Sequence, residues 1–157
     1  MEEVTPDINT LKREEDVPLS VLVSIIHRSH SVYVKNRIKN DNISFGQFSF
    51  LIYLNDKEDI SQNDLVNNFK MTDGVVTRAL QKLEKNNYIT RSIDSTNQRK
   101  KRIKITPEGR ALAEKLRKIE DSWEKEVWKF LNTNELEEFK ETLQTASLIS
   151  LKEEKNI

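Results

Sequence analysis

The chain has 157 residues, of which 36% are hydrophobic and 33% charged, and its formal net charge is zero. This length allows one domain with a hydrophobic core, and three glycines and three prolines suit a helical protein with few tight loops. The absence of cysteine excludes disulfides, thiol redox sensing and cysteine-based zinc sites. No run is apolar enough to span a membrane, and the acidic N-terminus lacks the basic and apolar regions of a signal peptide, so we expect a cytoplasmic protein with no membrane partner.

The N-terminal part of the chain predicts an arm followed by two helices. Residues 1–16 are acidic and polar without periodicity, which predicts a flexible arm. A long helix is expected from Leu19 to about Asn40, and residues 21–26 at its start are almost continuously apolar. A helix that is apolar on several sides is buried on several sides, so this segment predicts contact with a partner subunit. A second helix is expected over residues 44–55.

Residues 61–86 predict two helices joined by a tight turn. Ser61 is placed to cap the first helix, and Asp64 lies in its first turn, where the helix dipole favours negative charge. Residues 70–71 form the turn, and Thr72 is the expected cap of the second helix. In that helix, apolar side chains recur at i, i+3, i+4 and i+7 and predict one buried stripe, formed by Val76, Ala79, Leu80 and Leu83.

The opposite side of the second helix carries short polar and cationic groups, which a helix that reads base edges in the major groove needs. The residues expected to contact DNA are Thr72, Asp73, Gly74, Thr77, Arg78, Gln81 and Lys82. Arg78 is the first choice for a base or phosphate contact. A glycine inside a helix costs about 1 kcal/mol relative to alanine. Close approach of the backbone to DNA would explain Gly74, and so would tolerance of glycine in the first turn.

A basic hairpin follows the two helices. Residues 88–93 alternate as a strand does, residues 94–98 have turn chemistry, and residues 99–105 form the returning strand. Asp59 and Ile60 are expected to add one short strand. Cations on the returning strand are expected to bind DNA phosphates, and the first of them also suits a narrow minor groove. These cations are Arg99, Lys100, Lys101, Arg102 and, further along the strand, Lys104.

The C-terminal third predicts two long helices. The first begins around Pro107, with proline at the first helical position, and extends to about Leu131. A break at residues 132–134 caps the second. Their apolar residues recur at steps of three and four, and few other residues of the chain are available to cover them. Pairing with a second copy of the chain is therefore the expected way to bury them. Trp123 and Trp128 are the expected buried anchors of these helices.

The fold class expected from these elements is mainly α-helical with a small β-hairpin wing. The expected regions are a flexible arm (1–16), a winged helix-turn-helix DNA-binding domain (44–106) and a helical dimerisation region (17–43 and 107–157). Residues 70–106 hold ten Lys or Arg against three Asp or Glu, whereas residues 107–157 hold nine against twelve. Positive charge gathered on one helix and one hairpin is typical of a surface that binds nucleic acid.

Residues 75–89 resemble the recognition helix and first wing strand of the MarR family of bacterial and archaeal transcriptional regulators. Residues 91–109 are similar to the family's wing, and the positions that fit its pattern are Asp94, Arg99, Thr106 and Gly109. Asn97 and Gln98 depart from the pattern, since the family has an aspartate and an arginine there. The resemblance covers roughly Leu19 to the C-terminus.

The resemblance implies a repressor that reads a palindrome in double-stranded DNA as a homodimer, with half-sites about one helical turn apart. It also implies a small-molecule effector, often a phenolic anion, in a cleft between the dimer and DNA layers. Binding of the effector would change the separation of the two reading domains and release the operator. Candidate cleft residues, for which core packing is the alternative, are Arg28, His30, Tyr33, Arg37, Phe48 and Tyr53.

No pattern indicates catalysis, a metal site or a cofactor. The sequence has no glycine-rich phosphate loop, nucleophile motif or paired His/Glu box. His27 and His30 lie three apart on one predicted helix, but no cysteine or carboxylate stands at matching spacing, which favours packing or cleft lining. We therefore expect no enzyme activity, no metal and no cofactor.

Two other functions fit a winged helix-turn-helix. One is a module that binds proteins, and the other is an architectural protein that binds DNA without sequence preference. The basic hairpin disfavours the first, because docking to a protein does not need so many cations. The polar second helix, with Thr77 and Arg78, disfavours the second, because a non-specific binder would carry mostly lysine.

Overall fold

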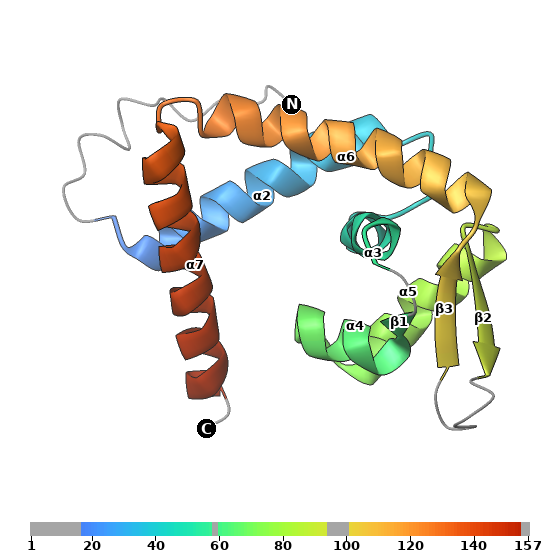
Figure 1. The fold of residues 1–157 in the computed structure, drawn as a ribbon. Coiled ribbons are helices and arrows are strands. Elements are labelled where there is room, and N and C mark those ends of the chain that lie inside the picture. Colours follow the sequence, from blue (N-terminus) through green and yellow to red (C-terminus); the bar gives the residue numbers. More distant parts are fainter. Residues whose placement is uncertain (1–16, 58–59, 94–100, 155–157) are drawn as a thin grey trace, which may run out of the picture. The chain divides into compact units, whose positions relative to one another are not determined.

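The structure is a computed structural model, and it describes residues 17–57, 60–93 and 101–154. The chain forms two compact units, and the boundary between them falls between Leu116 and Arg117, inside one helix. The helices and strands (Figure 1) are, in chain order, α2 (Leu19–Ile38), α3 (Phe45–Asn55), β1 (Ile60–Ser61), α4 (Gln62–Phe69), α5 (Asp73–Lys85), β2 (Ile89–Ile93), β3 (Lys101–Ile105), α6 (Pro107–Val127) and α7 (Thr133–Glu153). The arm and the hairpin turn predicted from the sequence lie outside the described residues.

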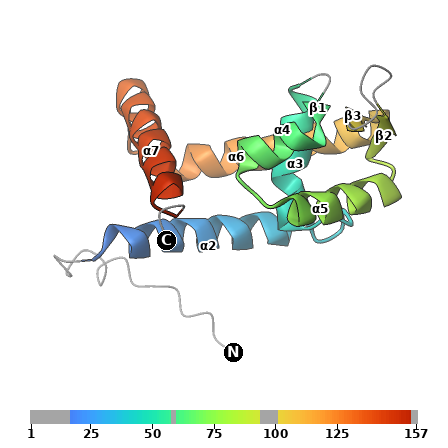
Figure 2. The ribbon, with the colours of Figure 1, turned by 90° about the horizontal axis from the view of Figure 1, so that it is seen from below.

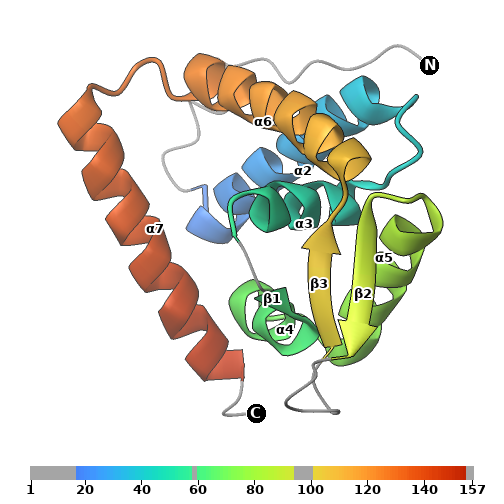
Figure 3. The same ribbon diagram turned by 45° about the vertical axis from the view of Figure 1, so that its right-hand side comes forward.

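The predicted fold class is confirmed, because the chain is mainly helical and has one small antiparallel sheet. The strands lie in the order β1–β3–β2, and Ile103 in the central strand pairs with Ile60 on one side and Arg91 on the other. Figure 3 shows β2 and β3 side by side in front of α5. The short third strand begins at Ile60, as predicted, and Asp59 lies outside the described residues.

The core of the first unit lies where α3, α4 and α5 meet the sheet. Each of these elements contributes side chains that are at most 2% exposed, among them Phe48, Leu65, Leu80 and Ile103. Three residues of the predicted stripe of α5 are inaccessible to solvent here, namely Val76, Leu80 and Leu83, whereas the fourth, Ala79, is only half-buried. One side of α5 is thereby fixed to the unit, and its other side is left outside.

α4 and α5 form the predicted helix-turn-helix. The Ser61 hydroxyl accepts a hydrogen bond from the Asp64 amide (3.2 Å), and the Asp64 carboxylate accepts one from the Ser61 amide (2.8 Å). This reciprocal pair satisfies two amides at the free end of α4. Lys70 has a φ of 50° and ends α4 in the left-handed conformation, so the predicted cap and turn are both confirmed.

The N-terminus of α6 is fastened to the turn that precedes β2. The Thr106 hydroxyl donates to the Asn87 carbonyl (2.7 Å) and accepts from the Gly109 amide (2.9 Å), while the Thr106 amide donates to the Tyr88 carbonyl (3.0 Å). A Cβ at Gly109 would lie 2.0 Å from the Tyr88 carbonyl oxygen. Position 109 therefore requires glycine, because the helix backbone lies directly against the base of the hairpin.

The second unit comprises the C-terminal part of α6 together with α7. Trp128 lies between Trp123 and Phe139, with ring centroids 6.1 Å and 5.1 Å apart. Both tryptophans are half-buried, so they anchor these helices as predicted but are less buried than predicted. α7 has no buried residue, and its Leu148 and Ile149 are 58% and 54% exposed. This unit covers little of the apolar surface of α7.

α6 ends at Val127, and the prediction that it reaches about Leu131 is wrong. The Leu131 amide donates to the Trp128 carbonyl (2.9 Å) in a tight turn. Asn132 then takes an extended backbone and caps α7 by accepting hydrogen bonds from the amides of Asn134 and Glu135. The predicted break is confirmed, but the turn that leads into it uses apolar residues that periodicity alone assigns to the helix.

Candidate nucleic-acid interface

α5 has two chemically different sides. Val76, Leu80 and Leu83 fix one side to the core. Thr77 is half-buried, and the other α5 residues expected to contact DNA are exposed, namely Asp73, Gly74, Arg78, Gln81 and Lys82. Figure 2 shows α5 running toward the strands, with its C-terminal end leading into β2. The structure thus gathers the polar and cationic groups of this helix on its accessible side.

Thr72 lies at the N-cap of α5 but does not cap the helix with its side chain. Its backbone is extended, and its carbonyl accepts from the amides of Val75 (3.0 Å) and Val76 (3.2 Å). Its hydroxyl makes no cap hydrogen bond. The predicted cap position is therefore confirmed, although Thr72 acts there through its backbone carbonyl, and its side chain is exposed at the start of the helix.

Gln62, the first residue of α4, joins the two helices of the helix-turn-helix. Its side-chain nitrogen donates to Asp73 Oδ1 (2.8 Å) and to Thr77 Oγ1 (2.9 Å). Both acceptors are among the expected DNA contacts, so Gln62 orients two of them within the free protein. The sequence did not predict this role for Gln62, because Asp73 and Thr77 are 11 and 15 residues away and no local pattern links residues at these separations.

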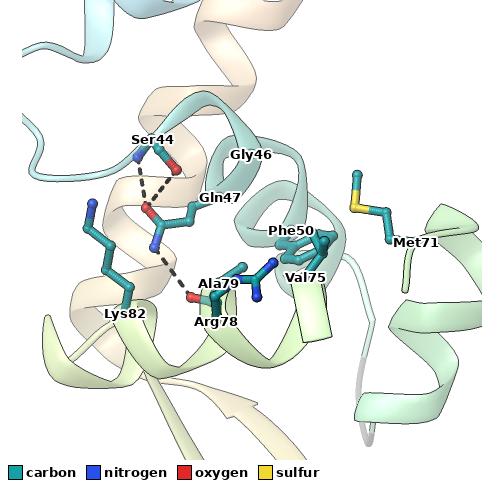
Figure 4. Close-up of a pocket in the computed structure, with 9 residues that line it drawn as sticks. All are labelled: Ser44, Gly46, Gln47, Phe50, Met71, Val75, Arg78, Ala79 and Lys82. Carbon is teal, nitrogen blue, oxygen red and sulfur yellow. Dashed lines mark hydrogen bonds between the residues drawn. The ribbon is translucent and has the colours of Figure 1, made fainter. Parts of the chain in front are cut away.

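A groove of about 290 Å³ lies between the start of α3 and α5. Figure 4 shows its lining residues, which are Ser44, Gly46, Gln47, Phe50, Met71, Val75, Arg78, Ala79 and Lys82. The buried Gln47 amide donates to the Ala79 carbonyl (3.3 Å) and accepts from the amide (2.7 Å) and hydroxyl (3.1 Å) of Ser44. This bridge holds the middle of α5 against α3. A serine followed three residues later by a glutamine is the capping pattern that could have revealed half of it.

The wing is tied to α5 by an ion pair. Arg91 of β2 donates through Nε to Glu84 Oε2 (2.9 Å), and its Nη2 forms a salt bridge with the same oxygen. The Arg91 side chain is only 15% exposed, so solvent screens the pair less than it screens a pair on the open surface. The orientation of the wing is therefore coupled to that of the recognition helix.

The cations predicted on the returning strand are only partly within the described residues. Arg102 is half-buried on β3, and Lys101 occupies the position on β3 that pairs with Ile93. Arg99 and Lys100 lie outside the described residues. Lys104 is exposed on β3 and extends the basic surface of the wing.

Packing within the chain does not require glycine at position 74. The nearest atom to a Cβ built there is Arg78 Nη1, at an ordinary contact distance of 3.9 Å, and the backbone of Gly74 does not take a positive φ. The fold would therefore accept a Cβ at this position, and close approach of DNA stays a prediction for Gly74.

The residues expected to line an effector cleft fall into separate groups. On α2, the Arg37 guanidinium lies 3.3 Å from the centre of the Tyr33 ring. Arg28 is exposed on the same helix, where it borders a shallow surface pocket formed by that helix alone. Two of these residues are thus exposed cations, Arg28 and Arg37.

The other three cleft candidates contact α3 or α4. His30 meets the Phe48 ring edge-on at 6.3 Å, and Phe48 is a core residue that is 1% exposed. The Tyr53 hydroxyl accepts a hydrogen bond from Asn68 (2.8 Å), and its ring lies edge-on to Phe69 of α4. Core packing, the alternative that the sequence left open, accounts for Phe48 in this structure.

His27 and His30 both pack edge-on against Phe45, with ring centroids 5.9 and 5.5 Å away. Within residues 17–57, 60–93 and 101–154, no three His, Asp or Glu side chains gather as a metal site would require. In the same ranges, no helix combines the length and apolar composition needed to cross a membrane.

Comparison with known proteins places this fold in a family. Residues 43–101 match the model of the MarR family. A solved structure of a MarR transcriptional regulator from Methanosarcina mazei Go1 is 27% identical, with a TM-score of 0.75 over 85% of this chain and 96% of that one. The part of the chain that carries the helix-turn-helix thus matches the MarR family.

Two further relatives extend the comparison. The structure of S. aureus MepR in complex with DNA is 28% identical, with a TM-score of 0.78 over 87% of this chain and 99% of MepR. The HTH-type transcriptional regulator BilQ of Clostridioides difficile (strain CD3) is 22% identical over 125 residues, which are 80% of this chain and 84% of BilQ. The resemblance stated from the sequence is confirmed, because the family model matches and the chain is similar over most of its length to MarR-family transcriptional regulators.

Proposed function

We propose that this MarR-family regulator is a repressor that binds a palindromic operator in double-stranded DNA as a homodimer. α5 enters the major groove, the β2–β3 wing flanks it, and a small-molecule effector such as a phenolic anion releases the operator. The observation that carries the proposal is the exposed polar and cationic side of α5, on a helix whose other side is fixed in the core. The DNA complex of S. aureus MepR supports the same use of the fold.

Position and chemistry assign the DNA contacts. Arg78 is exposed near the middle of α5, and its guanidinium suits bidentate contact with the O6 and N7 atoms of guanine. The polar positions around it that approach base edges are Thr72, Asp73, Gly74, Thr77 and Gln81. The cations that bind phosphates are Lys82, Arg99, Lys100, Lys101 and Arg102, and Arg99 also suits a narrow minor groove.

The homodimer accounts for apolar side chains that each unit leaves exposed. On α2, Leu19 is 80% and Val23 is 56% exposed, and on α7 Leu148 and Ile149 are more than half exposed. Complete burial of one such side chain is worth about 1.5–3 kcal/mol. A second copy supplies an apolar partner for each of these helices, and a two-fold protein matches a palindrome. The proposed dimerisation region is 17–43 together with 107–157.

The effector part of the proposal rests on the family resemblance and on the charge of α2. Arg28 and Arg37 are exposed cations on this helix, and Arg37 already stacks on the Tyr33 ring. An aromatic anion offers both a carboxylate or phenolate for a guanidinium and a ring for an aromatic face. The candidate contacts remain those named from the sequence.

Selection of binding sites followed by competition tests the proposal. The full chain would select duplexes from a random-sequence library, and its affinity for the selected duplex would be compared with a scrambled duplex at one salt concentration. We expect inverted repeats with half-site centres about 10 base pairs apart, and an affinity ratio of at least about 1,000. A ratio near one would identify an architectural DNA binder. Absence of binding to any duplex would favour a protein-binding module, and either result would overturn the proposal.

A further inference from the structure

A glutamine outside the recognition helix controls the chemistry that this helix presents. Gln62 is half-buried at the start of α4, and its side-chain nitrogen lies 2.8 Å from Asp73 Oδ1 and 2.9 Å from Thr77 Oγ1. Residues four apart on a helix are neighbours on its surface, so the Gln62 amide is inserted between two groups that would otherwise meet each other.

The chemistry of the three groups fixes the direction of both hydrogen bonds. A carboxylate only accepts, so the Gln62 atom that faces Asp73 is the amide nitrogen. The second hydrogen of that nitrogen goes to Thr77 Oγ1. Thr77 is therefore the acceptor in this contact, and its own hydroxyl hydrogen points in another direction.

The Gln62 amide also takes the place of a hydrogen bond that could form within α5. Without the amide, the Thr77 hydroxyl is free to turn and donate to the Asp73 carboxylate one turn earlier, a charge-assisted bond that would consume its hydrogen. With the amide in place, the amide satisfies that carboxylate oxygen. Within the described part of the chain, no acceptor takes the Thr77 hydrogen, which is therefore available to a group outside the chain.

We propose that Gln62 is a specificity-determining residue, which acts by presenting Thr77 to DNA as a hydrogen-bond donor. The inference rests on the proposed function, in which α5 lies in the major groove. A threonine whose hydroxyl turns freely either donates to or accepts from a base edge and so reads little sequence. The Gln62 amide takes one of the two lone pairs of Thr77 Oγ1 and leaves its hydrogen unused, which favours base acceptors, namely purine N7, guanine O6 and thymine O4, over the amino groups of adenine and cytosine.

The substitution Gln62→Glu reverses this arrangement. A glutamate only accepts hydrogen bonds, so it takes the Thr77 hydrogen and leaves the oxygen lone pairs of Thr77 for the base. It also repels the Asp73 carboxylate. We expect the preference at one base pair in each half-site to move from a base acceptor to an amino group. We also expect the wild-type operator to bind about fivefold more weakly, as the loss of one hydrogen bond implies.

The matched control for charge is Asn63→Asp. Asn63 is exposed, is the next residue of α4, and undergoes the same amide-to-carboxylate change. We expect this variant to weaken binding to all duplexes alike without changing any base preference. A thermal unfolding curve of each variant checks that it is folded. If Gln62→Glu is unfolded, Gln62→Met keeps the side-chain volume, and we expect it to move the preference toward an amino group as well, because Thr77 is then free to donate to Asp73.

A double-mutant cycle identifies Thr77 as the group through which Gln62 acts. Thr77→Val removes the hydroxyl at almost constant shape, and we expect it to abolish the base preference at the same pair. Gln62→Glu should then cause no further change of preference in the Thr77→Val background. A shift that persists in that background would overturn the inference, because another group would be the reader.

The readout is competition between operator duplexes that carry each of the four base pairs at every position. If folded Gln62→Glu has the wild-type profile, the inference is overturned, while the preference of the wild type for its operator leaves the proposed function standing. If the wild type prefers no sequence, the proposed function is overturned and this inference with it.

Discussion

α5 and α7 differ in which of their sides the chain covers. Three side chains of α5 have no solvent exposure, namely Val76, Leu80 and Leu83, whereas α7 has no buried residue at all. α5 thus buries its apolar side within its own unit and leaves polar groups outside. α7 leaves leucine and isoleucine side chains outside. The contrast favours two kinds of external partner, a polar polyanion for α5 and an apolar surface for α7.

The substitution with the largest expected effect removes the inner anchor of α5. Leu80→Ala should lower the free energy of unfolding by about 2–5 kcal/mol, because a fully buried leucine leaves a cavity. Urea denaturation of the full chain measures the change, and we expect DNA affinity to fall with the folded fraction. An unchanged midpoint would show that this side of α5 is not held by the core.

The same change in α7 is the matched comparison. Leu148 is 58% exposed, so Leu148→Ala should leave the secondary structure of the chain intact. In the proposed dimer this leucine is buried by the second copy, and we expect its truncation to weaken dimerisation by about 1.5–3 kcal/mol. Sedimentation equilibrium gives the dimer constant. An unchanged constant would remove Leu148 from the interface, and a wild type that is monomeric would overturn the homodimer.

The outer side of α5 is tested by Arg78→Ala. Arg78 is exposed, so we expect little change in stability but a loss of about 1–3 kcal/mol in binding to the selected operator. Arg110→Ala removes an exposed arginine from α6 and serves as the control for total charge. Equal losses for the two variants in gel-shift titrations would mean that Arg78 contributes only general charge.

The smallest expected effect comes from the wing. Lys104→Ala removes an exposed cation from β3, and we expect it to weaken binding to all sequences alike. The slope of log affinity against log salt concentration should become shallower by about one. A loss confined to one base pair of the operator would instead identify Lys104 as a base-reading residue.

Local signals in the sequence were sufficient for the helix ends that depend on neighbouring residues. The Ser61–Asp64 cap and the break at Asn132 were predicted because the groups involved are three residues apart. The end of α6 was predicted incorrectly, since Phe130 and Leu131 continue the apolar periodicity beyond the helix.

Contacts between distant residues could not be predicted from the same signals. Gln47 and Ala79 are 32 residues apart, and nothing in the spacing of either predicts their hydrogen bond. Gln62 and Thr77 are 15 apart and come together only when the turn at Lys70 places α4 against α5. The sequence thus indicated which side of α5 is exposed, but not which residues orient the side chains on it.

The junction at Gly109 sets where this regulator can flex. Two hydrogen bonds from Thr106 to Asn87 and Tyr88, and a backbone contact at Gly109 too close for a Cβ, join the start of α6 to the base of the hairpin. A rotation of α6 relative to the hairpin at this point would break these contacts together, so the junction resists bending. The Glu84–Arg91 pair joins the same hairpin to α5. These contacts couple α5, the hairpin and the start of α6, so in the proposed dimer a signal that changes the spacing of the two reading domains would act through another part of the molecule.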